Sequence, residues 1–338
     1  MRDLLVAGGG PIGLATAIYA RLAGLSVTVV EPRPAPVDKA CGEGLMPGAV
    51  ARLRELGVHP DGRAFHGIRY LSPTRTAEAR FRAGPGLGVR RTDLHAALLA
   101  RALELGVEQV RGRVDDVVQE SDQVHAAGLR ARWLVAADGL HSPVRRVLGL
   151  DRSTAGAPRY GQRRHFRVAA WTDLVEVHWS GSAEAYVTPI ADDVVGVAAL
   201  CGQGRRFEDV LTEFPALAQR LDGAVALTEV RGAGPLRQDA AARRRGRVLL
   251  VGDAAGYVDA LTGEGIATGL ATAAAAVEAV VAGRPQDYEQ AWRRATRRYR
   301  LLTATLLRAS QIPSVRPHIV PAASRLPRVF AGIVDLLA

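Results

Sequence analysis

The sequence predicts an α/β protein in which a mixed, largely parallel sheet is joined to an antiparallel-sheet domain and a helical C-terminus. Three observations predict this class. A β-α-β pattern opens the chain, residues 165–200 alternate apolar and polar side chains with period two, and an α/β pattern returns at the apolar run 247–251. A length of 338 residues suits two intimately joined domains.

The opening β-α-β unit is predicted from three short patterns. Residues 3–7 form an apolar strand, Pro11 to Gly24 a helix with small residues facing a sheet, and Ser26 to Glu31 a β-branched strand. Three prolines then predict a loop over residues 32–38.

Helices and strands alternate through the rest of the chain. Glycines end two helices, expected at residues 47–56 and 92–105. The antiparallel segment is expected to turn near residues 180–182 and 192–193. Further strands are expected at residues 107–111, 114–118, 133–137 and 247–251, and an Ala-rich helix at 265–282.

These patterns divide the chain into three parts. Residues 1–67, 88–158 and 238–285 form a discontinuous α/β domain, residues 68–87 and 159–237 form the antiparallel domain, and residues 286–338 form C-terminal helices. The α/β domain is split because its last strand arrives late in the sequence.

A glycine-rich turn follows the first strand directly, with the spacing Gly8-x-Gly10-x-x-Gly13. Gly8 permits a tight turn, Gly10 lets the backbone approach a pyrophosphate, and Gly13 lets the helix pack closely on the strand. The helix N-terminus offers free N–H groups and a positive dipole end to phosphates. Glu31 ends the second strand, where a carboxylate can accept both ribose hydroxyls of an adenosine. The segment therefore predicts a Rossmann-type dinucleotide site.

Two further acidic residues follow buried strands. Asp138 precedes Gly139 directly after the strand expected at residues 133–137, and Asp253 follows Gly252 after the late strand 247–251. Ligands bind at such carboxyl ends of strands in open α/β sheets, and the carboxylate of Asp253 can accept a flavin ribityl hydroxyl. The loop 262–266 then opens a long helix, whose N-terminus can stabilise negative charge on a reduced flavin.

Together the three motifs resemble those of the FAD-dependent oxidoreductases that include aromatic hydroxylases (group A flavoprotein monooxygenases), flavin-dependent halogenases and geranylgeranyl reductases. The resemblance covers residues 3–282. It implies a Rossmann-type FAD-binding domain that holds FAD noncovalently, with the antiparallel part as the substrate domain. Arg91 matches an arginine that contacts FAD in this family, with Arg90 as the near alternative, and Val114 matches the position that meets the adenine. The residues implied in cofactor binding are Gly8, Gly10, Pro11, Ile12, Gly13, Glu31, Pro32, Arg33, Arg91, Val114, Asp138, Gly139, Gly252, Asp253, Gly263, Gly265 and Ile266.

The resemblance leaves the reaction open. The favoured interpretation is monooxygenation, in which NAD(P)H reduces FAD and oxygen from O₂ passes to an aromatic or polyketide-like molecule in a pocket that excludes water. The alternative is a reductase that delivers hydride to a C=C bond of a prenyl or other hydrophobic substrate, because the segment Cys41-Gly42-Glu43-Gly44-Leu45 resembles geranylgeranyl reductases. A third interpretation is a flavin-binding protein without redox turnover. Lys39, the only lysine, lacks the context of a halogenase's catalytic lysine.

Cys41 and Glu43 are the candidate catalytic residues, since a thiol and a carboxyl next to a flavin can move protons. Each also has a structural interpretation, as a small residue filling a tight loop and as a solvated carboxylate. His165, His178 and Tyr186 lie on the antiparallel segment and are the candidate substrate-binding residues, with ordinary packing as the alternative.

Composition narrows the compartment and the partners. Two cysteines cannot make a disulfide scaffold and the N-terminus runs straight into a strand, so we expect a cytoplasmic protein with no signal peptide. No metal site and no membrane span are expected. The net charge of +10 comes with no nucleic-acid motif, so the expected partner is a small hydrophobic substrate. Arginines 293–300 give one helix a basic face that either contacts a membrane surface or faces water; the oligomeric state stays open.

Overall fold

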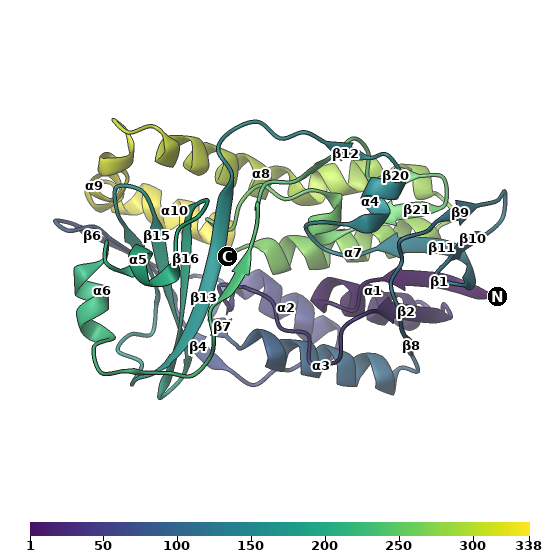
Figure 1. The fold of residues 1–338 in the computed structure, drawn as a ribbon, viewed down its shortest axis with the longest axis horizontal. Helices are drawn as coiled ribbons and strands as arrows, with labels where there is room; N and C mark the ends of the chain where they lie inside the picture. The colour runs from purple at the N-terminus through teal and green to yellow at the C-terminus, as the bar shows by residue number, and fades with distance from the viewer.

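The computed structural model describes residues 1–338, and its strands are gathered into two large sheets at the two ends of the molecule's long axis (Figure 1). The N-terminus lies at the outer edge of the first sheet, whereas the C-terminus lies near the middle of the view, between the sheets. Helices α7 (Gly265–Val281) and α8 (Tyr288–Gln311) run between the two ends.

The first sheet contains the predicted β-α-β unit and has a parallel centre. The strand predicted at residues 247–251 pairs with the strand predicted at residues 133–137, so the split α/β part forms one sheet. Its parallel strands, in spatial order, are β21 (Val248–Leu250), β11 (Leu129–Ala136), β1 (Arg2–Ala7), β2 (Val27–Glu31) and β8 (Glu108–Arg111). Antiparallel strands extend it: β20 (Arg244–Arg245), β10 (Val124–Ala126) and β9 (Val118–Gln119).

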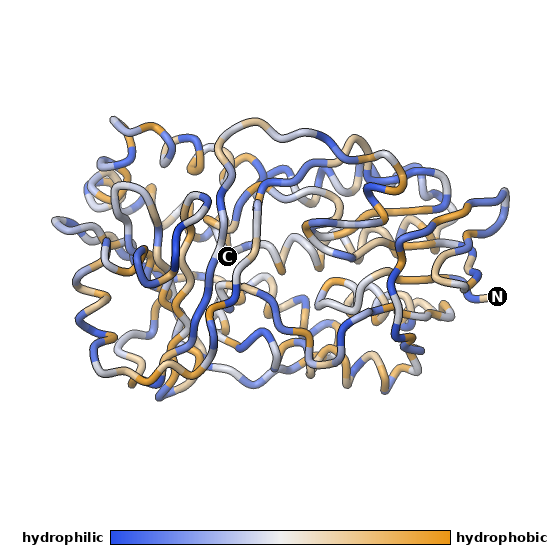
Figure 2. Tube along the Cα trace, in the orientation of Figure 1, coloured by the Kyte–Doolittle hydropathy of each residue, from blue (hydrophilic) through white to orange (hydrophobic).

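Helices cover this sheet because small residues let them approach closely. In α1 (Pro11–Leu22) the alanines at positions 15, 17 and 20 are fully buried. This helix packs against α7 and against α3 (Arg91–Glu104), and α2 (Pro47–Glu55) packs against α7. The result is one contiguous core of 44 buried residues. In Figure 2 the inner strands of this sheet are mostly hydrophobic.

The second sheet is antiparallel as the period-two alternation predicts, except where β14 pairs parallel with β5. Its turns fall at residues 180–183 and 192–193, close to the predicted positions. Its strands, in spatial order, are β17 (Val225–Ala226), β13 (Arg159–Arg167), β16 (Val194–Gly202), β15 (Glu184–Ala191), β14 (Val175–Trp179), β5 (Gly67–Leu71) and β6 (Thr76–Arg80), with β18 (Arg231–Ala233) also on β13. Helices α5 (Phe207–Leu211) and α6 (Pro215–Arg220) bury one face of it.

Short strands connect the two parts. β3 (Gly44–Leu45), β7 (Gly86–Gly88) and β4 (Arg63–Phe65) form a small sheet, and β12 (Asp151–Arg152) pairs with β19 (Asp239–Ala240) where the chain leaves and re-enters the α/β part.

The C-terminal segment folds back over the second sheet. After α8 come η3 (Arg316–His318), α9 (Ile319–Arg325) and α10 (Pro327–Leu337), of which α9 and α10 pack against β6. The last carbonyl oxygen, of Ala338, accepts a hydrogen bond from the N–H of Gly48 at 2.6 Å. None of the helices combines the length and the apolarity needed to cross a bilayer.

The strand predicted at residues 114–118 is wrong. Residues 112–117 form a loop in which Val114 is buried while Asp115 and Asp116 face outward. Asp116 accepts a hydrogen bond from the N–H of Ala127 at 3.1 Å, which holds the loop against β10 without a strand ladder.

Candidate functional site

A cavity of about 620 Å³ lies between the two sheets. It is lined by the carboxyl ends of the parallel strands on one side and by β14, β15 and β16 on the other. Except for Gly13 and Gly252, every residue predicted to bind the cofactor lies in its wall. Cys41, Glu43 and Tyr186 also line it, so sequence positions far apart converge on one site.

The glycine turn has the close approaches that only glycine allows. Gly8 has a φ of +99°, and a Cβ on Gly13 would lie 1.8 Å from the carbonyl oxygen of Gly8. A Cβ on Gly9 would lie 2.8 Å from the Cβ of Glu31. A Cβ on Gly10, in contrast, would lie near one atom alone, Nη2 of Arg91, at 3.8 Å. Gly10 therefore faces open space in the cavity at the start of α1. This is a cradle for a phosphate group.

Glu31 lies at the end of β2 beside this turn. Its carboxylate accepts a hydrogen bond from the N–H of Gly9 at 2.8 Å and pairs with Arg33. Burial tends to raise the pKa of Glu31, but the hydrogen bonds from Arg33 and Gly9 outweigh burial and hold the pKa below its usual value. The ionised carboxylate can accept ribose hydroxyls once the half-exposed Arg33 side chain turns away.

His95 is a further residue that contacts the glycine turn, and the sequence analysis missed it. It is buried on α3, and its Nε2 lies 2.9 Å from the carbonyl oxygen of Gly9. Burial lowers the pKa of His95. A histidine on the apolar face of a predicted helix was the only available sign of this contact.

Two side chains in the cavity wall each have one buried polar atom without a protein partner. Asp138 accepts a hydrogen bond from the N–H of Val144 at 3.1 Å through Oδ2, while its Oδ1 has no partner, and burial raises the pKa of Asp138. Arg91 likewise leaves its Nε unpaired. A cofactor with phosphates and hydroxyls would satisfy both groups. Together with the open Gly10 backbone, they fit the pyrophosphate region of FAD.

Asp253 provides the carboxylate that follows the strand β21. It lies in η1 (Gly252–Ala255), directly after β21, and its only ion pair is with Lys39, at 3.7 Å. Ser142 caps α4 (Pro143–Val147) by accepting from the N–H of Arg145 at 2.9 Å. The carboxyl ends of β11 and β21 thus present Asp138 and Asp253 to the same cavity.

A buried arginine holds these two strand ends together. Arg145 donates to the carbonyl oxygens of Ala254 and Leu140 at 3.0 and 2.9 Å and pairs with Asp151 at 2.5 Å. This role cannot be predicted from the sequence, because nothing local shows that the Arg145 side chain is buried.

The loop that carries Cys41 and Glu43 forms one wall of the cavity. The Cys41 Sγ is half-buried and accepts a hydrogen bond from the N–H of Glu43 at 3.4 Å. Glu43 has a φ of +60° and is buried, and it accepts from the N–H of Arg91 at 2.8 Å. Its other oxygen lies 2.5 Å from Nε2 of His165. Burial therefore contradicts the interpretation of Glu43 as a solvated carboxylate, while its role as a proton carrier stays a prediction.

Of the three predicted substrate residues, only Tyr186 lines the cavity. Its hydroxyl donates to the carbonyl oxygen of Leu261 at 2.8 Å. His165 lies on β13 under the Cys41 loop, and His178 lies on the opposite face of the second sheet, 3.3 Å from Glu176. The substrate contacts predicted for His165 and His178 are therefore corrected: both histidines are buried partners of carboxylates.

The end of the cavity on the second sheet is apolar and carries no charged side chain. Tyr257, which the sequence analysis did not single out, packs beside the loop 262–266, since a Cβ on Gly265 would lie 3.4 Å from the Tyr257 ring. This end is lined by Met46, Phe65, Ile68, Tyr70, Val175, Val177, Tyr186, Thr188, Ala198, Leu200, Leu236, Tyr257, Leu261 and Leu337.

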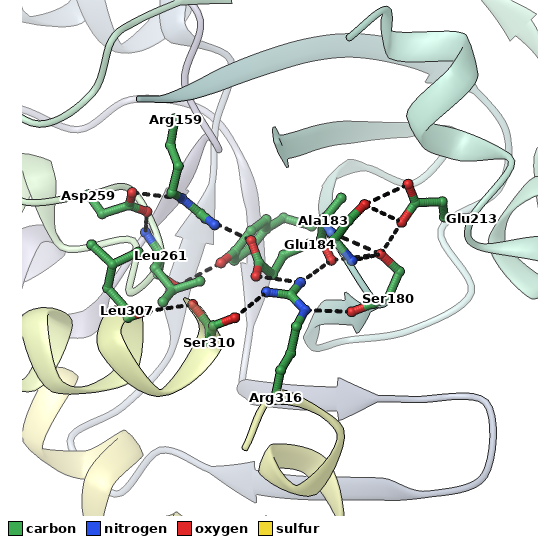
Figure 3. A network of polar contacts seen from close by, with 12 residues as sticks. Arg159, Ser180, Ala183, Glu184, Glu213, Asp259, Leu261, Leu307, Ser310 and Arg316 are labelled. Atoms are coloured by element: carbon green, nitrogen blue, oxygen red, sulfur yellow. Dashed lines mark hydrogen bonds and ion pairs between the residues drawn. The ribbon is translucent and has the colours of Figure 1, made fainter. Parts of the chain in front are cut away.

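A buried ionic network closes the far side of this apolar end (Figure 3). Glu184 is fully buried on β15 and lies 2.7 Å from both Arg159 and Arg316, while Arg159 also pairs with Asp259 at 3.0 Å. Arg316 belongs to η3, so the network fixes the C-terminal segment to the second sheet.

A second, polar groove of about 370 Å³ adjoins the main cavity. The groove is otherwise lined by four glycines together with Tyr160 and Arg205, and the residues that it shares with the main cavity are Lys39, Leu140, His141, Gly161, Gln162 and Ala233. No group of three or more His, Cys, Asp or Glu side chains is arranged to hold a metal ion.

Comparison with known proteins identifies the family of the chain. Residues 1–283 match a family described as an FAD binding domain. A menaquinone reductase of Mycolicibacterium smegmatis is 31% identical over 86% of this chain and 79% of its own. A digeranylgeranylglycerophospholipid reductase of Methanosphaera stadtmanae is 26% identical over 85% of this chain and 80% of its own, and a rifampicin monooxygenase of Rhodococcus hoagii is 27% identical over 80% and 62%.

Among solved structures, the flavin-dependent brominase Bmp2 superposes with a TM-score of 0.86 at 19% identity, over 99% of this chain and 93% of its own. This likeness concerns the fold. The family match covers most of the chain and the residues that form the cofactor end of the cavity. The protein is a member of the FAD-binding-domain family of FAD-dependent oxidoreductases.

Proposed function

We propose that this enzyme reduces a C=C bond of a hydrophobic substrate with a prenyl chain, with FAD as the hydride carrier. One observation carries the proposal: the part of the cavity wall that the second sheet contributes has no charged side chain, whereas the charged lining residues all come from the α/β part and the loop after β2. A substrate that fits this end is itself apolar, because an unpaired charge or polar group would lose its hydration there.

The relatives support this substrate class. The menaquinone reductase and the digeranylgeranylglycerophospholipid reductase are named for substrates that carry isoprenoid chains, and each matches this chain over most of both sequences. This support moves the preference from oxygenation, which the sequence motifs alone favour slightly, to reduction.

The residues of the chain have three tasks in such a reduction. Bound FAD, once reduced, supplies a hydride to one carbon of the double bond. The apolar wall holds that bond and excludes water, with Tyr186 fixed by its hydrogen bond to Leu261. The Cys41 thiol gives the proton to the other carbon and regains one from solvent through its half-exposed loop. One hydride and one proton together balance the reduction.

We propose NAD(P)H as the electron donor, approaching through the polar groove. That groove meets the main cavity at Lys39 and His141 and offers Arg205 for an anionic group. Mixing oxidised holoenzyme with NADH or NADPH without oxygen should bleach the flavin absorbance; failure with both would mean that another donor is used.

The reaction itself is tested with holoenzyme reduced by dithionite under argon and mixed with menaquinone or geranylgeraniol. We expect the flavin to reoxidise without oxygen, and the product to gain two hydrogens by mass spectrometry. In D₂O, the gain of one solvent deuterium at carbon identifies the proton step. Cys41→Ser should slow that step, whereas Cys201→Ser, at a buried cysteine outside the cavity, should not.

Monooxygenation is the second candidate, favoured by the rifampicin monooxygenase match and by the same water-excluding cavity. With ¹⁸O₂ and NAD(P)H it predicts a product that carries one ¹⁸O atom, and no substrate-dependent reoxidation under argon. Those two outcomes together would reject the reductase. Halogenation is disfavoured, because the only lysine is ion-paired with Asp253 at the cofactor end.

A further inference from the structure

The positive charge of the protein is concentrated near its C-terminus. Residues 290–334 contain nine arginines and no aspartate or glutamate, so this segment alone accounts for +9 of the net +10. Several of these arginines, among them Arg294, Arg297, Arg308, Arg325 and Arg328, are exposed.

The exposed apolar side chains are concentrated in the same segment. On α10 and its first cap, Leu326, Val329, Ile333 and Leu336 are 40–56% exposed and recur at helical spacing along one side. The adjacent side of α10, about 100° further around the helix and formed by Phe330, Val334 and Leu337, is buried in the core of the second sheet. The helix is thus apolar on two sides, and only one of them is used inside the molecule.

A second exposed apolar stripe lies on the neighbouring helix. In α8, Leu301 is 63% exposed and Ile312, directly after the helix, 47%. Arg298, one turn before Leu301, donates to the carbonyl oxygen of Leu336, which brings α8 against the end of α10. Figure 1 shows α9 and α10 at the upper left, where the long helix α8 ends, and Figure 2 shows hydrophobic and hydrophilic turns alternating along them.

We propose that this C-terminal surface, formed by Leu301, Ile312, Leu326, Val329, Ile333 and Leu336 with the surrounding arginines, docks on an anionic lipid membrane. Amphipathic helices with aliphatic side chains and flanking cations bind such interfaces, because the aliphatic groups enter the acyl boundary while guanidinium groups pair with lipid phosphates. The one acidic residue beside these positions, Asp335, is paired with Arg82 at 3.1 Å, so its charge is offset where the surface would meet anionic lipid. A nucleic acid would pair with the arginines but would leave the aliphatic stripe in water.

This surface lies directly over the substrate cavity. Leu337, on the inner side of α10, lines the apolar end, and the next residue, Ala338, is held by Gly48 of α2. A lipid substrate would therefore leave the bilayer beside α10 and enter the cavity a short distance away. That last step rests on the proposed function, but membrane docking itself does not.

Docking is tested by flotation of the holoenzyme with vesicles of phosphatidylcholine alone or with one-third phosphatidylglycerol. We expect flotation only with the anionic vesicles, and its loss in high salt. Val329→Ser with Ile333→Ser should abolish flotation, and Arg325→Gln with Arg328→Gln should weaken binding roughly 30-fold. All four positions are exposed, so folding is preserved. Leu103→Ser, at an exposed leucine on α3, is the matched control and should float like the wild type.

Equal flotation of the Val329/Ile333 variant and the wild type would overturn the proposal, as would no flotation of the wild type. If the surface instead pairs two copies of the chain, sedimentation velocity without lipid will show a dimer that the serine variant dissociates, which also overturns it. Activity on water-dispersed geranylgeraniol should be unchanged in the serine variant. Failure of the reductase assay is therefore separable from failure of docking.

Discussion

Glu43 Oε2 lies 2.5 Å from His165 Nε2, and this contact joins the loop beside the cofactor end to β13 of the second sheet. On the same strand, Arg163 lies 2.5 Å from Asp38 and 3.6 Å from the other oxygen of Glu43. The Cys41 loop is thus held at two points by a strand from the other part of the molecule. The position of the Cys41 thiol therefore depends on how the two sheets pack.

Glu43→Ala should lower the free energy of unfolding by about 3 kcal/mol, because it leaves His165 buried without its carboxylate partner and Arg163 with Asp38 alone. Glu43→Gln should cost less, because the amide oxygen can still accept from the N–H of Arg91. Urea unfolding followed by far-UV circular dichroism measures both.

Glu78→Ala is the matched control, because Glu78 pairs with Arg69 at 2.9 Å where both side chains are partly exposed. Its removal should cost under about 1 kcal/mol. Equal losses of unfolding free energy in the Glu43→Ala and Glu78→Ala variants would mean that the buried network stabilises the fold no more than an exposed ion pair does.

The cofactor end could be predicted from the sequence because each of its parts is local. A strand, a glycine turn, a helix and an acidic residue such as Glu31 are read within thirty positions, and the Asp253 strand repeats the logic. The Glu43–His165 contact spans 122 positions and the Arg145 contacts with η1 span 108 and 109, so no local pattern signals them.

The two histidines show a second limit. Alternation correctly places side chains on two faces of a strand, but it does not tell which face meets the cavity. His178 points away from the cavity, because its neighbours Val175 and Val177 take the inner face. His165 shares a side of β13 with Gly161 but lies further along, where the Cys41 loop covers the sheet.

Asp253→Ala should weaken FAD binding by about 10- to 100-fold, because a charged hydrogen-bond acceptor is lost where the ribityl chain is expected. The protein should purify with less bound flavin, measured from its absorbance at the flavin band relative to protein. Asp287→Ala, at an exposed carboxylate in η2 (Pro285–Asp287), is the control and should keep the wild-type flavin content. A fully yellow Asp253 variant would remove this role from Asp253.

Arg145→Met should destabilise the chain by about 3 kcal/mol or more, because the carbonyl oxygens of Leu140 and Ala254 would be buried without a donor. Thermal unfolding of the flavin-free protein isolates this effect from cofactor loss. Arg146→Met is the matched control. The Arg146 side chain is 69% exposed, and its contact with the same Asp151 is longer, at 3.9 Å. A similar melting temperature for both variants would contradict the bridging role of Arg145.

Glu264 gives the protein a pH-dependent stability. It precedes α7 at the loop that faces the flavin end, and its Oε2 is buried without a partner. Burial raises the pKa of Glu264 from 4.5 to about 8, with Arg298 opposing the shift. The folded chain therefore keeps this proton at neutral pH, whereas the unfolded chain releases it above its ordinary value.

Because the unfolded state alone loses the proton between pH 4.5 and about 8, stability should fall as pH rises through that window and level off above it. Below pH 4.5 both states are protonated and Glu264 adds no pH dependence. The fall should reach at most about 5 kcal/mol, at about 1.4 kcal/mol for each pH unit. Glu264→Gln should remove it, so that urea midpoints at pH 5 and pH 8 converge relative to the wild type. Glu278→Gln, at an exposed position of α7, should leave the wild-type slope intact, and an unchanged slope in the Glu264 variant would show that another group controls it.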